Sequence, residues 1–524
     1  MEEKKTSFDH IEKLTKIGIA LSAEKDINNF FNLVLEEAMN YTSADGGTIY
    51  TVSEDGKFLD FKIVCTLSKN FKLGIADTVK WPSIPLFDEQ GNKNLKNFAS
   101  YVAHTGTTAS IEDVYNQNIY DNSGTKKYDK ANNYRSKSFA AIPLKNHEND
   151  VLGVIQLINA MDKDRNIISF TEQHITMLTS LASQAAIALT NKKLIEGLEK
   201  LLNQFIRSIA KAIDRKSPYT GGHISRVASL TEQLAKEIDE DNKIYKDIHF
   251  TEDEFQEISI SGWMHDIGKI TTPIFIMDKA TKLETMLDRI LLIQTRFEMI
   301  KLAIKNDLLK CSKKRKTELE KLLIQLDEDW KFLQKANIGG EFMKDGDVKR
   351  IDRIFEFCYE FEGKKYTLLN EDEKTNLTIR RGTLLSEEID KMREHAVVTH
   401  EMLNQLTFPK KYKNVPLYAS AHHEKLNGKG YPFHLTAEKL PLQARIIAVA
   451  DLFEALTAAD RPYKKGKTLS ETFRILGFMA KDHEIDKHIL DLLINSGVYL
   501  DYAKKYLKPE QIDEVNFEKI KEMY

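Results

Sequence analysis

The sequence predicts an α+β multidomain protein with three parts. The N-terminal part is an antiparallel sheet with flanking helices, the second a long connecting helix, and the third an all-α bundle with a helical insertion. Three observations support this fold class. Pairs of strand-like runs lie within residues 1–168, a long run without proline crosses residues 169–215, and helical periodicity dominates residues 216–524. At about 150 residues per domain, 524 residues suffice for two or more domains.

The N-terminal region begins with helical periodicity over residues 8–40 and then changes to strand-like alternation. Two hairpins are predicted from apolar runs around polar turns: Thr48–Val52 with Phe58–Cys65, and Ser138–Leu144 with Val151–Ile158. Between the hairpins, residues 68–135 are mixed in character, and we expect long loops over a pocket. These elements predict a small sheet domain.

The connector from Phe170 onward lacks proline and holds a single glycine, Gly197. Its apolar residues recur at alternating steps of three and four, which is the pattern of a coiled-coil seam. They are Ile175, Leu178, Leu181, Ala185, Leu189, Leu194, Leu198, Leu201, Phe205, Ile209 and Ile213. The pattern predicts a helix of about 42 residues, about 63 Å long. Two interpretations of this helix stay open: it pairs with the same helix of a second chain in a homodimer, or it packs on the domains of its own chain.

Composition limits the classes of function. Hydrophobic residues make up 42% and charged residues 30%, as in ordinary globular proteins with real cores. A formal charge of −3 gives no electrostatic case for nucleic-acid binding. Three scattered cysteines favour a reducing compartment and argue against a thiolate zinc site. We expect a cytoplasmic protein without a membrane segment, since no signal-peptide core or apolar run of about 20 residues is present.

The third region collects side chains that can bind metal ions. Five histidines and two aspartates stand out by their local sequence: His223, His265, Asp266, His395, His422, His423 and Asp451. Imidazole is the commonest metal ligand among side chains. Asp451 interrupts an apolar run and needs a partner, because an unpaired buried charge is costly. The adjacent histidines, 422 and 423, would diverge by about 100° on a helix, so we expect them to approach a cluster by different routes.

Seven such ligands fit a hydrolytic site with two metal ions. If Asp266 bridges, each ion receives about four protein ligands, which leaves room for water and phosphate. Histidine and carboxylate ligands without thiolate favour iron, manganese or another borderline divalent ion. Lys269 follows Asp266 by three residues. It would share a helix face with Asp266 and neutralise a phosphate oxygen if the helix continues.

These residues resemble the HD-GYP family of metal-dependent phosphohydrolases. His265-Asp266-Ile267-Gly268-Lys269 matches the first half of the signature, and His422-His423-Glu424 through Gly430-Tyr431-Pro432 matches the second. The resemblance implies a helical bundle that hydrolyses cyclic di-GMP to pGpG and often to GMP. It also implies that the seven residues are the metal ligands, with Asp266 bridging, and that Lys269, Arg461 and Lys464 contact substrate phosphates.

Residues 1–168 resemble a GAF domain, a module for small-molecule sensing and dimerisation. The matching stretches begin at Asp45-Gly46-Gly47, Ser138-Phe139-Ala140 and Leu152-Gly153-Val154. The pattern of cyclic-nucleotide-binding members is incomplete, because Ala160 follows Asn159. The domain is therefore a ligand sensor or a dimerisation platform without a ligand.

The chain departs from the HD-GYP pattern at two places. Members with three metal ions carry a glutamate four residues before the first histidine, where this chain has Tyr219, so two ions are favoured. Residues 284–380 form an insertion, with helical runs at Leu283–Ile304 and Glu318–Leu333. Its basic run Lys313-Lys314-Arg315-Lys316 is a solvated helix face or a contact to the guanine side of a substrate.

The sequence thus predicts a cyclic di-GMP phosphodiesterase with two divalent metal ions, regulated by a GAF domain. Two alternatives stay open. One is hydrolysis of another cyclic dinucleotide, such as cyclic GMP-AMP, and the other is a non-catalytic signalling adaptor. Tyr431-Pro432 either closes a turn or presents a surface to GGDEF-domain (diguanylate cyclase) partners, as the resemblance implies.

Overall fold

The computed structural model describes residues 15–16, 18–21, 23–24, 26–74, 81–216, 221–310, 312–459 and 466–524. The chain forms two compact units, residues 1–200 and 201–524. The division therefore falls inside the long helix rather than at its ends. Within these described ranges, no helix is both long and apolar enough to cross a bilayer.

The first unit is built on one antiparallel sheet with the strand order β3-β2-β1-β7-β6-β5. Its strands are β1 (Gly46–Val52), β2 (Phe58–Thr66), β3 (Phe71–Leu73), β5 (Ala109–Ile111), β6 (Phe139–Lys145) and β7 (Val151–Ile158), with β4 (Ile84–Pro85) beside β2. Both predicted hairpins are present: β1 pairs with β2, and β6 pairs with β7. A further short pair joins β8 (Ala160–Met161) and β9 (Ile167–Ile168).

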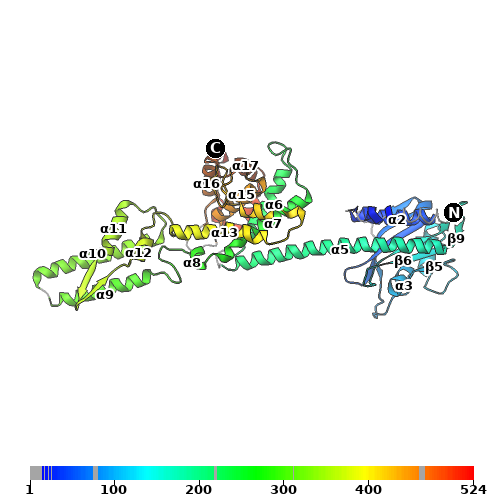
Figure 1. Ribbon diagram of the computed structural model, residues 1–524, viewed down its shortest axis with the longest axis horizontal. Coiled ribbons are helices and arrows are strands. Elements are labelled where there is room, and N and C mark those ends of the chain that lie inside the picture. Colours follow the sequence, from blue (N-terminus) through cyan, green and yellow to red (C-terminus); the bar gives the residue numbers. More distant parts are fainter. Residues whose placement is uncertain are drawn as a thin grey trace. The chain divides into compact units, whose positions relative to one another are not determined.

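Helices cover both faces of this sheet (Figure 1). On one face, α2 (Ile27–Thr42) contributes Phe31 and Leu35 to a core shared with Ile49, Ile142 and the first part of the long helix. On the other face, α3 (Phe98–Thr105) packs against β6 and β7. The segment predicted as long loops also holds α4 (Ser123–Asn132), so it is more regular than expected.

The predicted long helix is present as α5, which runs without a break from Glu172 to Asp214, 43 residues (Figure 1). Its apolar seam is divided into three parts. Leu178, Leu181, Ala185 and Leu189 are buried in the core of the first unit. At its end, Ile213 is buried in the second unit and Ile209 packs against the same core, beside Ile206 and Ala210, which the predicted seam does not include. Between them, Leu194, Leu198 and Leu201 are each about 60% exposed, so only the middle of the seam is available to a second chain.

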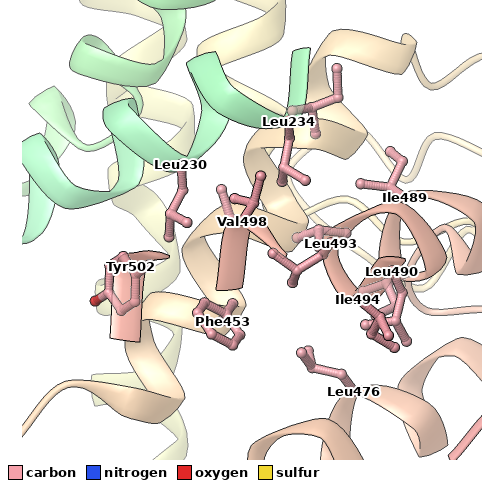
Figure 2. Close-up of a cluster of buried hydrophobic side chains, with 14 of the residues drawn as sticks. Leu230, Leu234, Phe453, Leu476, Ile489, Leu490, Leu493, Ile494, Val498 and Tyr502 are labelled. Atoms are coloured by element: carbon pink, nitrogen blue, oxygen red, sulfur yellow. The ribbon is translucent and has the colours of Figure 1, made fainter. Parts of the chain in front are cut away.

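The second unit is a helical bundle. In chain order its main elements are α6 (His223–Asp239), α7 (Glu252–Met264), η2 (Ile267–Thr271), α8 (Ile274–Met277), α13 (Ser386–Asn404), η3 (Lys410–Tyr412), α14 (Val415–Ser420), α15 (Leu442–Thr457), α16 (Leu469–Lys481), α17 (Lys487–Asn495), α18 (Val498–Tyr506), η4 (Pro509–Gln511) and α19 (Phe517–Lys521). Figure 2 shows the core, where Leu230 and Leu234 of α6 meet Phe453 of α15 and the apolar faces of α16, α17 and α18. This core fixes α6 and α15 side by side.

The insertion has a hydrophobic core of its own, around Phe297, Leu326 and Ile351. Its helices are α9 (Ile290–Leu308), α10 (Lys313–Ile338), α11 (Asp345–Glu356) and α12 (Glu371–Leu377). The basic run at 313–316 is fully exposed, as the interpretation of a solvated helix face expects.

The prediction that the third region is all-α was wrong in one detail. Two strands, β10 (Cys358–Phe361) and β11 (Lys364–Thr367), form a hairpin in the insertion. Its turn, Glu362-Gly363, adopts positive φ at both residues, which is the backbone of a tight two-residue hairpin turn. The first inserted helix also begins later than predicted. The backbone before it is turned instead, since Glu284 accepts hydrogen bonds from the amides of Ala280 and Thr281.

Candidate metal centre

Five chain segments bring the seven predicted ligands together. His223 is the first residue of α6, and His265 and Asp266 directly follow α7. His395 lies inside α13, His422 and His423 follow α14, and Asp451 lies inside α15. All seven residues are buried or nearly so.

The backbone packs closely where these segments meet. Gly268 of η2 lies against α13, and a β-carbon at this glycine would stand 2.0 Å from the carbonyl oxygen of His395. Thr399 joins the same two segments, because its hydroxyl accepts a hydrogen bond from the Gly268 amide at 3.0 Å and donates to the His265 carbonyl at 3.2 Å. The glycine in the His265-to-Lys269 motif is therefore required for close approach.

The ligand atoms fall into two groups that share a centre. His395, His422 and His423 form what we call the imidazole half, and His223, His265 and Asp451 form the carboxylate half. Within each group, the candidate ligand atoms lie within 4.8 Å of one another. A third group, of His265, Asp266 and His422, joins the two halves.

Asp266 lies between the halves, with one oxygen toward each. Its Oδ2 is 3.3 Å from Nε2 of both His223 and His265. Its Oδ1 is 3.5 Å from Nε2 of His395 and 3.9 Å from Nε2 of His422. This is the arrangement expected of a carboxylate that bridges two ions.

Four of the histidines are oriented by acceptors on their outer nitrogen. Nδ1 of His265, His395 and His422 lies 2.6 to 2.8 Å from the backbone carbonyls of Gly262, Met392 and Ala419. Nδ1 of His223 lies 2.6 Å from Oε2 of Glu454. Because these acceptors require a proton on Nδ1, Nε2 is the nitrogen of each ring that faces the centre and can bind a metal ion when it carries no proton.

The inner atoms of this cluster fit a cation. Nε2 of His265, Nε2 of His422 and Oδ1 of Asp266 are buried without a hydrogen-bond partner among the described residues. Acceptors that face one another in a buried site are costly unless a positive charge lies between them. Nε2 of His395 and Nε2 of His423 are 3.1 Å apart. Two nitrogens bound to one ion at about 2.1 Å and a right angle would be about 3.0 Å apart.

The two halves differ in how they bind protons. In the imidazole half, burial lowers the pKa of His395 and holds the pKa values of His422 and His423 well below the usual range. In the carboxylate half, burial opposes charge on His223, but the Glu454 and Asp266 carboxylates together outweigh it and raise the pKa of His223 to about 10. Burial also opposes ionisation of Asp266, yet Lys269 and His265 hold its pKa well below the usual range.

Lys269 lies beside Asp266 for a different reason than predicted. The helix ends at Met264, and the next residues form the 3₁₀ segment η2. Residues three apart are eclipsed in a 3₁₀ turn, so the Lys269 ammonium still contacts Oδ2 of Asp266. The Lys269 side chain is 25% exposed, which leaves it accessible to a ligand.

Glu454 is a residue that the sequence reasoning missed. It is 1% exposed, and its second oxygen, Oε1, accepts hydrogen bonds from Arg226 at 2.6 to 2.7 Å. Burial raises its pKa, but His223 and Arg226 outweigh burial, so the net pKa is lowered. The signal was present in the sequence, since Glu454 is a second carboxylate three residues after Asp451 in the otherwise apolar stretch Ile446–Leu456.

The loop at 424–435 is organised by one buried carboxylate. Glu424 accepts hydrogen bonds from the backbone amides of Phe433 at 2.6 Å and Leu435 at 2.9 Å. Gly430 lies against the backbone of Glu424, where a β-carbon would approach Cα to 2.4 Å. The Tyr431 ring is thereby placed on His423, with ring centroids 4.8 Å apart. The turn therefore supports a predicted ligand, while a role as a surface for GGDEF partners stays a prediction.

The adjacent histidines are closer than a helix would allow. They occupy a turn after α14, and their ring centroids are 4.0 Å apart. The divergence of about 100° that applies to a helix therefore does not apply here, and both side chains reach the imidazole half. Arg461 and Lys464, predicted to contact phosphates, lie outside the described residues, as does Tyr219.

Comparison with protein families finds one match in each unit. Residues 26–189 match the GAF domain, and residues 372–489 match the HD domain. The chain carries a GAF domain and an HD domain. The HD match includes His395, His422, His423 and Asp451, while His223, His265 and Asp266 precede it.

Three curated proteins resemble parts of the chain. The cyclic di-GMP phosphodiesterase response regulator RpfG of Xanthomonas campestris is 33% identical over 127 residues, 24% of this chain and 32% of that protein. The 3'3'-cGAMP-specific phosphodiesterase 1 of Vibrio cholerae is 38% identical over 80 residues, 15% of this chain and 18% of that protein. The cyclic di-GMP phosphodiesterase of Thermotoga maritima is 35% identical over 98 residues, 19% of this chain and 26% of that protein. The matches thus span about a third or less of each relative.

Proposed function

We propose that the chain is a metal-dependent phosphodiesterase that hydrolyses cyclic di-GMP to pGpG, with GMP as a further product. One observation carries the proposal: Asp266 lies between two groups of inward-facing ligand atoms, with Lys269 beside it. The names of the relatives support the substrate class.

The donor set indicates which ions the centre would hold. His395, His422 and His423 would hold one ion, and His223, His265 and Asp451 the other, with Asp266 shared. Imidazole and carboxylate ligands without sulfur favour iron or manganese. Such ions, when bound, supply a nucleophile from water at neutral pH and polarise a phosphoryl oxygen.

The protein's own residues bind and orient the substrate. Lys269 donates to a non-bridging phosphate oxygen, where its charge offsets the charge that develops as water attacks the phosphorus. Arg461 and Lys464 contact substrate phosphates, since guanidinium and ammonium groups form charge-assisted hydrogen bonds with phosphate. One water is consumed for each phosphorus–oxygen bond that breaks, and the released ribose oxygen takes a proton.

The same proposal includes a homodimer regulated by the GAF domain. Leu194, Leu198, Leu201 and Phe205 form an exposed apolar stripe along α5, at steps of four, three and four residues. This spacing fits a two-helix coiled coil between two copies of the chain. We propose that GAF regulation and any GGDEF partner act on this dimeric form.

A direct assay tests the enzyme proposal. The purified chain is loaded with Fe²⁺ or Mn²⁺, its ions per chain are counted, and hydrolysis of cyclic di-GMP is followed by chromatography. We expect two ions per chain and release of pGpG. A chain that holds two ions and releases neither pGpG nor GMP would be a non-catalytic adaptor, and the proposal would be wrong.

Cyclic GMP-AMP is the second candidate substrate, because one relative carries the name of a 3'3'-cGAMP-specific phosphodiesterase. The same assay with both dinucleotides in competition decides between the candidates. A higher kcat/KM for cyclic GMP-AMP would change the substrate and leave the proposed reaction type intact.

A further inference from the structure

The last residue of α5 contacts the start of the helix that carries His223. The carboxylate of Asp214 accepts hydrogen bonds from the backbone amides of Gly222 at 3.2 Å and Ile224 at 3.4 Å. The residue directly before α6, Gly222, offers no side-chain cap of its own. A carboxylate at the N-terminus of a helix satisfies amides that lack partners within that helix and complements the helix dipole. Asp214 therefore caps α6 from the linker helix.

Two residues later, Lys216 contacts the segment that carries Lys269. Its ammonium donates to the carbonyl oxygens of Lys269 at 3.0 Å, Ile270 at 2.5 Å and Thr272 at 2.7 Å. An ammonium group has three donors, so all three are used on one stretch of backbone. A cation at this position stabilises carbonyls at the end of η2, as it does at the C-terminus of any helix.

The apolar side of the same helical turn packs beside the centre. Ile213 and Ala210 belong to the core that contains Met264 and Ile267, the two residues that flank His265-Asp266. The end of α5 thus contacts the centre through two charged groups of opposite sign and one apolar cluster.

We infer that Asp214 and Lys216 are positioning residues, which fix His223 and Lys269 relative to the end of α5. The consequence for catalysis rests on the proposed function. Because α5 is continuous from the core of the first unit, a displacement of its last turn reaches a predicted metal ligand and the predicted phosphate-binding lysine together. This turn is therefore the place where a change in α5 alters the centre.

Hydrogen exchange on the full chain tests the inference. In Lys216→Met we expect amides in residues 267–272 to exchange at least tenfold faster, since the three hydrogen bonds that hold this stretch of backbone are lost. Lys216→Arg keeps several donors and should restore most of the protection. In Asp214→Asn the faster exchange should lie at residues 222–226. The matched control is Lys411→Met, which removes a lysine paired with Asp253 in the same unit.

Kinetics of the metal-loaded chain separate positioning from general damage. We expect Lys216→Met to lower kcat about tenfold while KM and the number of bound ions stay within twofold, with recovery in Lys216→Arg. The inference would be overturned if Lys216→Met and the control Lys411→Met had the same exchange rates at residues 267–272 and the same kcat. Exchange does not depend on turnover, so a wild-type chain that hydrolyses nothing would end the proposed function and leave this result to decide the inference.

Discussion

The two halves of the centre use different means to keep a ligand nitrogen ready for a cation. In the imidazole half, three neutral rings are buried together, and burial keeps protons off them. In the carboxylate half, His223 faces Glu454 on one side and Asp266 and Asp451 on the other, at 2.6, 3.3 and 3.4 Å. One half excludes the proton, while the other attracts it and must release it before a metal ion binds.

The difference shows how one buried centre can tolerate several imidazoles and several carboxylates. Three neutral imidazoles need no counter-charge, whereas a carboxylate cluster needs a proton or a metal ion to offset its charge. Asp266 belongs to both halves, and substitutions can therefore be chosen to affect both or only one.

The largest effect is expected from Asp266→Asn. An amide at this position carries no negative charge and has one oxygen instead of two, so it cannot bridge and both ions should be lost. We expect turnover to fall by roughly 10³-fold, about 4 kcal/mol in the activation barrier. Metal analysis and turnover measure this, with Asp253→Asn as a control for a surface carboxylate. Retention of both ions in Asp266→Asn would show that the halves do not depend on this residue.

Two further substitutions should separate the halves. His423→Ala removes a ligand from the imidazole half, and Asp451→Ala removes one from the carboxylate half. Each should reduce the content from two ions per chain to one, measured by elemental analysis after dialysis. The control is His434→Ala, at an exposed histidine outside the centre. If either single substitution removes both ions, the two halves are a single cooperative site.

Metal affinity should depend on pH in the carboxylate half. His223 must lose its proton before it binds an ion, and its pKa is raised to about 10, so apparent affinity should rise about tenfold per pH unit below 10. Titration of His423→Ala, which retains the carboxylate half, should show an increase of about 100-fold from pH 6.5 to 8.5. In Asp451→Ala, which retains the imidazole half, apparent metal affinity should change little over the same pH range. The pKa values of the three histidines in that half are lowered, so they carry no proton to lose.

The same shift predicts how the metal-free chain responds to pH. A raised pKa in the folded state means that protonated His223 stabilises the fold. This contribution is fully present below the ordinary histidine value of about 6.5 and is lost as pH rises through about 10. Thermal unfolding of the metal-free chain measures this, and a stability that is flat from pH 7 to 10 would contradict the assignment.

The smallest effect is expected from Glu454→Gln. The amide still accepts a hydrogen bond from His223 but carries no charge, so the pKa of His223 should fall and apparent affinity for the ion in the carboxylate half should depend less on pH between 6.5 and 8.5. The Glu424→Gln variant is the matched control, because it changes a buried carboxylate that holds a loop without contact to His223. The same change in pH dependence in both variants would mean that Glu454 acts on the fold and not on His223.

The sequence identified residues more reliably than it identified geometry. Four of the seven candidate ligands stand in the two motifs and the other three were selected by the family resemblance, and the structure brings all seven together. Their conformations were harder to predict. His422 and His423 occupy a turn and Lys269 a 3₁₀ segment, and in both cases a regular helix had been assumed.

Other features depend on contacts that no local pattern contains. The seam of α5 has one continuous spacing in the sequence, yet its first part packs on the sheet and its last part on the bundle. Periodicity gives the apolar face of a helix but not its partner. Glu454 and Lys216 likewise gain their roles from segments distant in the sequence. The β10–β11 hairpin was predictable, since Glu362-Gly363 separates two runs that contain Tyr359, Phe361 and Tyr366.

The bridging position of Asp266 is the central claim, and electron paramagnetic resonance tests it most directly. The chain loaded with two Mn²⁺ ions should give the signal of a magnetically coupled pair, because a shared carboxylate places two ions about 3.5 to 4 Å apart. The His423→Ala variant, which should hold one Mn²⁺ ion per chain, should give the signal of an isolated ion instead. An isolated-ion signal from the wild-type chain at two ions per chain would contradict a shared centre.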